Sequence, residues 1–141
     1  MITNRWLLAA GILDGAAALL HLGCILGGPS WYRFFGAGER IARMAERSMW
    51  RPVPVTLGIA LVLTLWAGAA LSGAGVLPRL PLLKTALGII AAIYLARAFA
   101  LPWMLSAMSD RGSTFLWVSS AIVLVFGIVH LIGLIGLIRS D

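Results

Sequence analysis

The stretch FLWVSSAIVLVFGIVHLIGLIGLI, residues 115–138, contains no Asp, Glu, Lys or Arg. A helix needs roughly 20 apolar residues to cross the hydrocarbon core of a bilayer, and this stretch supplies them. Similar apolar stretches lie at about residues 6–26, 53–71 and 82–108. Pro102 lies inside the last of these and predicts a kink or an interfacial ending there. Because the backbone in lipid must hydrogen-bond within its own segment, we expect helices rather than strands. The predicted fold class is an all-α integral membrane four-helix bundle.

The composition of the whole chain agrees with this prediction. Of its 141 residues, 61% are hydrophobic and 11% are charged, whereas a soluble domain carries about 25% charged residues. A small soluble domain cannot bury such an excess of apolar side chains, which excludes a soluble or nucleic-acid-binding protein. No repeat or linker divides the chain, so residues 1–141 are expected to form a single transmembrane domain. The expected location is the bacterial inner (cytoplasmic) membrane.

The connection between the first two apolar stretches predicts an amphipathic interfacial helix over about residues 38–50. Ile41, Met44 and Ala45 fall on one helical face, and Arg43 and Glu46 fall on the other. Aromatic and arginine side chains together are typical of a helix that lies among lipid headgroups. The residues expected to contact headgroups are Trp31, Arg33, Arg40, Arg43, Arg47, Trp50 and Arg51.

The net charge of +6 comes from basic residues beside the apolar stretches, which suit anionic lipid headgroups. Alternating spans place Arg5, Arg79, Lys84 and Arg139 on one membrane side and the arginines of the long loop, with Arg111, on the other. Glycine and alanine spaced four apart, as at Gly11 and Gly15 or Gly23 and Gly27, favour close helix packing. The expected partners are membrane lipids and a homo-oligomer or larger membrane complex, and no nucleic acid.

Ionisable side chains inside membrane spans are costly, so each one is a candidate for function. They are Asp14, His21, Arg97 and His130, with Tyr94 one turn before Arg97. At a helical rise of about 1.5 Å per residue, Asp14 and His130 share one depth, and His21 and Arg97 share another roughly 10 Å away. We expect Asp14 to pair with His130, and Arg97 to lie near His21 and Tyr94. A pairing of Asp14 with Arg97 is the alternative, because the long arginine side chain can reach along the bundle. The five residues predict a buried ligand-binding pocket, or alternatively a polar network that only fixes helix register.

No cofactor is expected. Two histidines in a helical bundle suggest bis-histidine haem, but His21 and His130 differ in depth by more than about 10 Å, so they cannot flank one iron. His21, Cys24, Met104 and Met108 contain soft ligands of the kind that bind Cu(I). Since Met and Cys are also ordinary core residues, packing is the favoured interpretation and no metal is expected.

Two resemblances add to this reading of the residues. Residues 21–63, HLGCILGGPSWYRFFGAGERIARMAERSMWRPVPVTLGIALVL, resemble the opening half of small four-span bacterial inner-membrane proteins of unknown function. Residues 39–52, ERIARMAERSMWRP, are distantly similar to the microsomal glutathione transferase-like membrane family, whose pattern matches Glu39, Arg40, Arg43 and Pro52. That resemblance implies glutathione-dependent chemistry. However, Arg47 stands where the family has an asparagine, and Trp50 or Arg51 where it has a glutamate.

The expected function is that of a small polytopic inner-membrane protein that binds or transports a small polar, anionic or lipophilic ligand in a buried polar pocket. One alternative is a membrane-embedded enzyme acting on a lipid or lipophilic substrate, with the glutathione-dependent type included. Another is an accessory subunit of a larger membrane complex. The sequence contains no nucleophile elbow, phosphate loop or dinucleotide fingerprint, so it leaves the question of enzymatic activity open.

Overall fold

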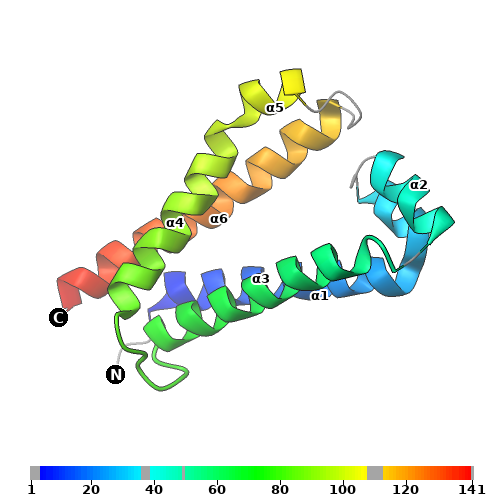
Figure 1. Cartoon of the computed structure of the whole chain (residues 1–141). Helices are drawn as coiled ribbons and strands as arrows, with labels where there is room; N and C mark the ends of the chain where they lie inside the picture. Colours follow the sequence, from blue (N-terminus) through cyan, green and yellow to red (C-terminus); the bar gives the residue numbers. More distant parts are fainter. Residues whose placement is uncertain (1–3, 36–38, 49, 108–112, 141) are drawn as a thin grey trace.

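The computed structural model describes residues 4–35, 39–48, 50–107 and 113–140 (Figure 1). Within these residues the fold is all-helical, with six helices and no strand. The helices are α1 (Arg5–Phe34), α2 (Glu39–Arg47), α3 (Val53–Gly73), α4 (Leu83–Phe99), α5 (Leu101–Ala107) and α6 (Ser113–Ser140).

Three of these helices, α1, α3 and α6, are each long and apolar enough to cross a membrane. The predicted third span instead forms two helices, because α4 and α5 are bent by 53° and pass the same test only together. The bend agrees with the kink predicted from Pro102. Helix α4 ends at Phe99, so Pro102 falls in the first turn of α5, where the missing backbone N–H removes no hydrogen bond.

Helix α1 is longer than predicted and breaks sharply at Gly28. The backbone there has φ 68° and ψ −155°, a conformation that side chains disfavour, and Pro29 follows. The indole of Trp31 returns onto the helix before the break, where a Cβ on Gly27 would lie 2.0 Å from the Trp31 Cγ. Gly23 and Gly27, predicted as a helix-packing face, therefore make room for an aromatic ring of their own helix.

Two helix pairs make up the fold. Helix α1 packs along α3, and α4 packs along α6. The pairs meet at the end that holds both termini and the α3–α4 connection, and they diverge toward α2 and α5 (Figure 1). The core follows this shape: one large cluster joins α1, α3, α4 and α6, while the clusters around Cys24 and around Met104 are separate. The four long helices share a core over only part of their length.

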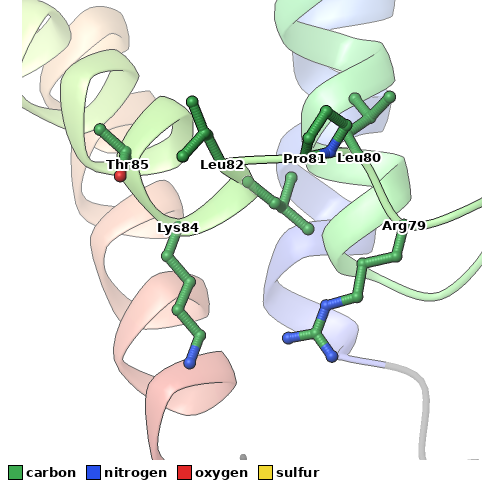
Figure 2. A pocket seen from close by; sticks show the side chains of 7 residues that line it. Arg79, Leu80, Pro81, Leu82, Lys84 and Thr85 are labelled. Atoms are coloured by element: carbon green, nitrogen blue, oxygen red, sulfur yellow. The ribbon is translucent and has the colours of Figure 1, made fainter.

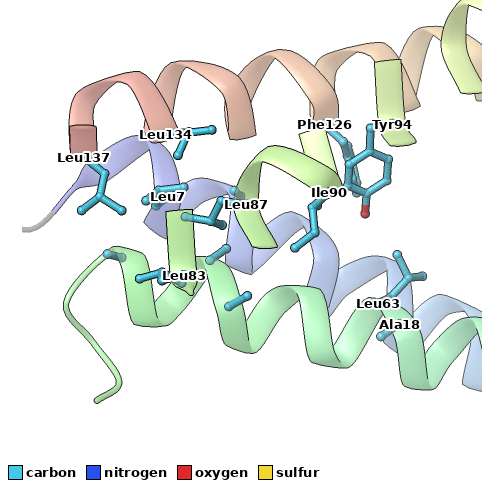
Figure 3. Close-up of a cluster of buried hydrophobic side chains, with 14 residues drawn as sticks. Leu7, Ala18, Leu63, Leu83, Leu87, Ile90, Tyr94, Phe126, Leu134 and Leu137 are labelled. Carbon is cyan, nitrogen blue, oxygen red and sulfur yellow. The ribbon is translucent and has the colours of Figure 1, made fainter. Parts of the chain in front are cut away.

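Leu7 anchors the shared core (Figure 3). Its side chain is fully buried, and a Cβ on either Gly73 of α3 or Gly133 of α6 would come within 2.7 Å of it. Nearby, the Asn4 side chain caps α1 by accepting from the Leu7 N–H at 3.2 Å and donates to the Gly133 carbonyl at 2.8 Å. The close contacts at the glycines and the Asn4–Gly133 hydrogen bond hold the start of α1 against α6.

Helix α2 is confirmed but shorter than the predicted 38–50, of which residues 38 and 49 lie outside the described residues. Its apolar side packs on the end of α1, because Ala42 and Ala45 are buried against Cys24 and Tyr32. The Tyr32 hydroxyl lies 2.9 Å from the Thr56 hydroxyl of α3. The apolar face of this predicted interfacial helix therefore packs partly against the protein itself.

Candidate functional site

One polar cluster joins the three helices α1, α4 and α6. Asp14 of α1 and His130 of α6 are both 0% exposed, and Tyr94 of α4 is 5% exposed. The Tyr94 hydroxyl donates to Asp14 Oδ1 at 2.6 Å, and His130 Nε2 lies 3.1 Å from Asp14 Oδ2. The depth calculation therefore paired Asp14 with His130 correctly, while Tyr94 joins this pair.

The surroundings of His130 determine where its hydrogen atoms lie. Nδ1 is 2.9 Å from the carbonyl oxygen of Phe126. A carbonyl only accepts, so the hydrogen-bond network assigns a hydrogen to Nδ1. In a neutral imidazole Nε2 would then present a lone pair toward Asp14 Oδ2, and two acceptors would face each other. The contact needs one more proton, either on His130 beside a carboxylate or on Asp14 beside a neutral imidazole.

Both of these protonation states leave the pair with no net charge, which is what a buried apolar setting favours. The separation of 3.1 Å is that of an ion pair. The two atoms are not aligned for a hydrogen bond, however, and neither has another hydrogen-bond partner among the described residues. A small rotation of either side chain would align the two atoms. The pair is therefore a candidate site for one exchangeable proton, and it is called the proton site below.

Aromatic rings enclose this proton site. The Tyr94 ring contacts Trp66 of α3 edge to face, with centroids 4.9 Å apart, and Phe126 of α6 at 5.5 Å. The His130 ring lies 5.4 Å from the Tyr94 ring. Figure 3 shows Tyr94 beside Phe126, with its hydroxyl directed away from α6. All four long helices therefore contribute to the site, and water is kept away from the Asp14–His130 pair.

Arg97 lies one turn beyond Tyr94 on α4 and makes different contacts from those expected. Its guanidinium donates to the hydroxyl of Ser120 at 3.1 Å and to that of Ser119 at 3.4 Å, both on α6. Arg97 is half-buried, whereas Ser120 is buried. These two hydrogen bonds of Arg97 go to α6, while the Tyr94 hydroxyl donates to Asp14, and the grouping of Arg97 with His21 stays a prediction.

His21 is not part of the cluster. It is half-exposed, and its Nδ1 lies 2.7 Å from the Ala17 carbonyl of its own helix. The residues weighed as a soft-metal site are also not brought together: Cys24 packs with α2, and Met104 packs with Leu116. Met108 lies outside the described residues.

The residues expected to contact headgroups are mostly on the surface. Arg43, Arg47, Arg51 and Trp50 are exposed. The guanidinium of Arg33 lies 2.7 Å from Glu46 Oε1. Trp31 is 45% exposed and its ring lies over Gly27. The side chain of Arg40 lies outside the described part of the chain.

Two sets of residues at the site were not predicted from the sequence. Ser119 and Ser120 carry a usable signal, because adjacent hydroxyls in an otherwise apolar stretch lie near the membrane depth expected for Arg97. Trp66 and Phe126 carry none, since aromatic residues are ordinary components of an apolar helix. Only the packing of α3 and α6 around Tyr94 distinguishes them.

The chain matches no protein-family model, no curated protein and no solved structure. Any assignment of function must therefore come from the site itself.

Proposed function

We propose that this chain is an integral membrane protein that crosses the bacterial inner membrane four times as a helical bundle, with α4 and α5 forming one bent span. The outward faces support this proposal, since large apolar side chains such as Leu26, Leu65 and Ile122 are 50–89% exposed. Contact of these faces with lipid hydrocarbon is favourable, whereas their exposure to water would be unfavourable. The chain directions support it too, because both termini lie at one end of the molecule (Figure 1).

The location of the two termini tests this topology. Four crossings put the N- and C-terminal tags of the full chain on the same membrane side, where a membrane-impermeant protease removes both or neither. If α4 and α5 instead form a re-entrant loop, the tags lie on opposite sides and only one is removed. Detergent-permeabilised vesicles, in which both tags must be cleaved, provide the control.

Within the membrane, we propose proton-coupled binding or transport of a small anion. The single observation that carries this proposal is the fully buried Asp14–His130 contact, which holds one proton between helices of the two pairs. Gain or loss of that proton by Asp14 or His130 changes the net charge of the buried pair between α1 and α6. Buried carboxylates and histidines of this kind serve proton relays in membrane proteins.

Arg97 supports an anionic ligand. Its guanidinium is held by the hydroxyls of Ser119 and Ser120, and the same donors suit a carboxylate or a phosphate. Arg97 follows Tyr94 by three residues, so its backbone is about 4.5 Å further along α4. An anion at Arg97 would therefore lie close enough to the proton site for the charges to influence each other in a medium of low dielectric constant.

Flux through reconstituted vesicles tests the coupling. Vesicles containing the full chain and an internal pH dye are given gradients of inorganic phosphate, nitrate or succinate. We expect proton uptake with at least one anion, and its loss in Asp14→Asn. The matched control is Glu46→Gln, which makes the same chemical change in a surface ion pair and should leave uptake intact. Unchanged uptake in Asp14→Asn would contradict the proposal.

A further inference from the structure

A second candidate site lies at the end of the molecule that holds both termini. Residues 79–85, in the connection between α3 and α4 and the first turn of α4, line an open pocket of about 520 Å³. Arg79 and Lys84 flank this pocket, and Figure 2 shows their side chains extending in the same direction. The pocket is far along α4 from the proton site at Tyr94.

The pocket is held in shape by a buried serine. Ser72, near the end of α3, is 4% exposed. Its hydroxyl donates to the Pro78 carbonyl at 2.7 Å and accepts from the Leu80 N–H at 3.0 Å. Two hydrogen bonds through one side chain fix the path of the loop that leads into the pocket.

The backbone at Leu82 adds a second unusual feature. Leu82 caps the start of α4 with φ 54° and ψ 24°, a left-handed conformation that is rare for a leucine. This conformation leaves the Leu82 side chain 81% exposed. No side chain caps the first turn of α4, whose N–H groups carry the positive end of the helix dipole. The site thus combines an outward apolar side chain with positive electrostatic potential.

The charge of this end favours an anion. Helix α1 begins and helix α6 ends at this end of the molecule (Figure 1), and Arg5 in the first turn of α1 and Arg139 in the last turn of α6 are exposed. Phosphate suits both the two basic side chains and a helix N-terminus.

We propose that this pocket binds the phosphate headgroup of an anionic phospholipid, with Leu80 and Leu82 contacting its acyl chains. The lipid is favoured over free phosphate because apolar residues 80–83 make up the middle of the lining. The proposal rests on the membrane insertion proposed above, but it does not depend on proton coupling.

Native mass spectrometry of the full chain tests the site. The protein is released from detergent micelles that contain equimolar phosphatidylglycerol and phosphatidylcholine with the same acyl chains. We expect several-fold preferential retention of phosphatidylglycerol, and loss of that preference in the double variant Arg79→Gln/Lys84→Gln. The matched control, Arg79→Lys/Lys84→Arg, keeps both positive charges at the pocket and should keep the preference.

Three results would overturn the lipid site. They are equal retention of both lipids by the unchanged protein, an intact preference in the Arg79/Lys84 variant, and displacement of phosphatidylglycerol by millimolar inorganic phosphate. The last result would indicate a site for free phosphate. Flotation with vesicles of phosphatidylcholine alone distinguishes failure of the lipid-site proposal from failure of membrane insertion. An inserted protein floats with these vesicles whether or not it selects an anionic lipid.

Discussion

His130 Nε2 lies 3.1 Å from Asp14 Oδ2, although the two residues are far apart in the sequence and both are completely buried. The other ring nitrogen of His130 faces the Phe126 carbonyl at 2.9 Å, which places a hydrogen on Nδ1 and leaves Nε2 facing the carboxylate. This relationship couples the first and last long helices of the chain, and it makes the consequences of substitution specific.

Asparagine at position 14 should preserve the fold. Its amide can donate to His130 Nε2 and accept from the Tyr94 hydroxyl, so both neighbours keep a partner. Asp14→Ala leaves both without one, and each unsatisfied buried group costs about 1–3 kcal/mol. We expect thermal unfolding in detergent to show a loss of several kcal/mol in Asp14→Ala, and about 1 kcal/mol or less in Asp14→Asn. Equal destabilisation by the two variants would contradict the assigned hydrogen bonds.

The two histidines provide a matched pair of substitutions. Each has its Nδ1 close to the carbonyl four residues earlier, at 2.7 Å for His21 and 2.9 Å for His130. Only His130 is buried against a carboxylate, so His130→Gln should destabilise by about 2–4 kcal/mol and His21→Gln by about 0.5 kcal/mol or less. Denaturant unfolding in mixed micelles, followed by Trp fluorescence, measures the difference. A larger effect at His21 would contradict the assignment of His130, rather than His21, to the buried cluster with Asp14 and Tyr94.

The break in α1 makes Gly27 sensitive to a single methyl group. A Cβ there would lie 2.0 Å from the Trp31 Cγ, whereas a Cβ on Gly15 meets nothing within 4 Å. Gly27→Ala should therefore destabilise by about 1–3 kcal/mol through overpacking, and Gly15→Ala should be neutral or stabilising by up to about 1 kcal/mol. Thermal unfolding compares the two, and Trp31→Ala should suppress the effect of Gly27→Ala. Without that suppression, the defect would not arise from the indole.

Leu82 offers a stabilising substitution. Glycine accepts the observed φ of 54° without the steric conflict of a leucine, and the lost side chain is 81% exposed. Leu82→Gly should raise the free energy of unfolding by up to about 1 kcal/mol. Leu77→Gly, in the same connection and 44% exposed, lacks the left-handed backbone and should lower it. Stability measured in detergent without added lipid keeps this effect apart from lipid binding.

Much of the architecture could be predicted because it depends on composition and periodicity. The apolar stretch 115–138 coincides with most of α6, and Pro102 indicated the bend between α4 and α5. The pairing of Asp14 with His130 could be predicted as well, since helical rise converts sequence position into depth. Depth does not specify rotation about the helix axis, which is why Tyr94 and Arg97 were assigned to the same group but contact different partners.

The sequence by itself determined that long apolar helices form, that one predicted span bends near Pro102, and that Asp14 and His130 lie at one depth. These properties follow from local backbone requirements and from the hydrophobicity of each segment. Only the tertiary structure decided that Trp66 and Phe126 enclose Tyr94, that Ser119 and Ser120 hold Arg97, and that Trp31 occupies the glycines of its own helix. Those contacts depend on how α1, α3, α4 and α6 rotate and cross, and packing between helices sets those angles.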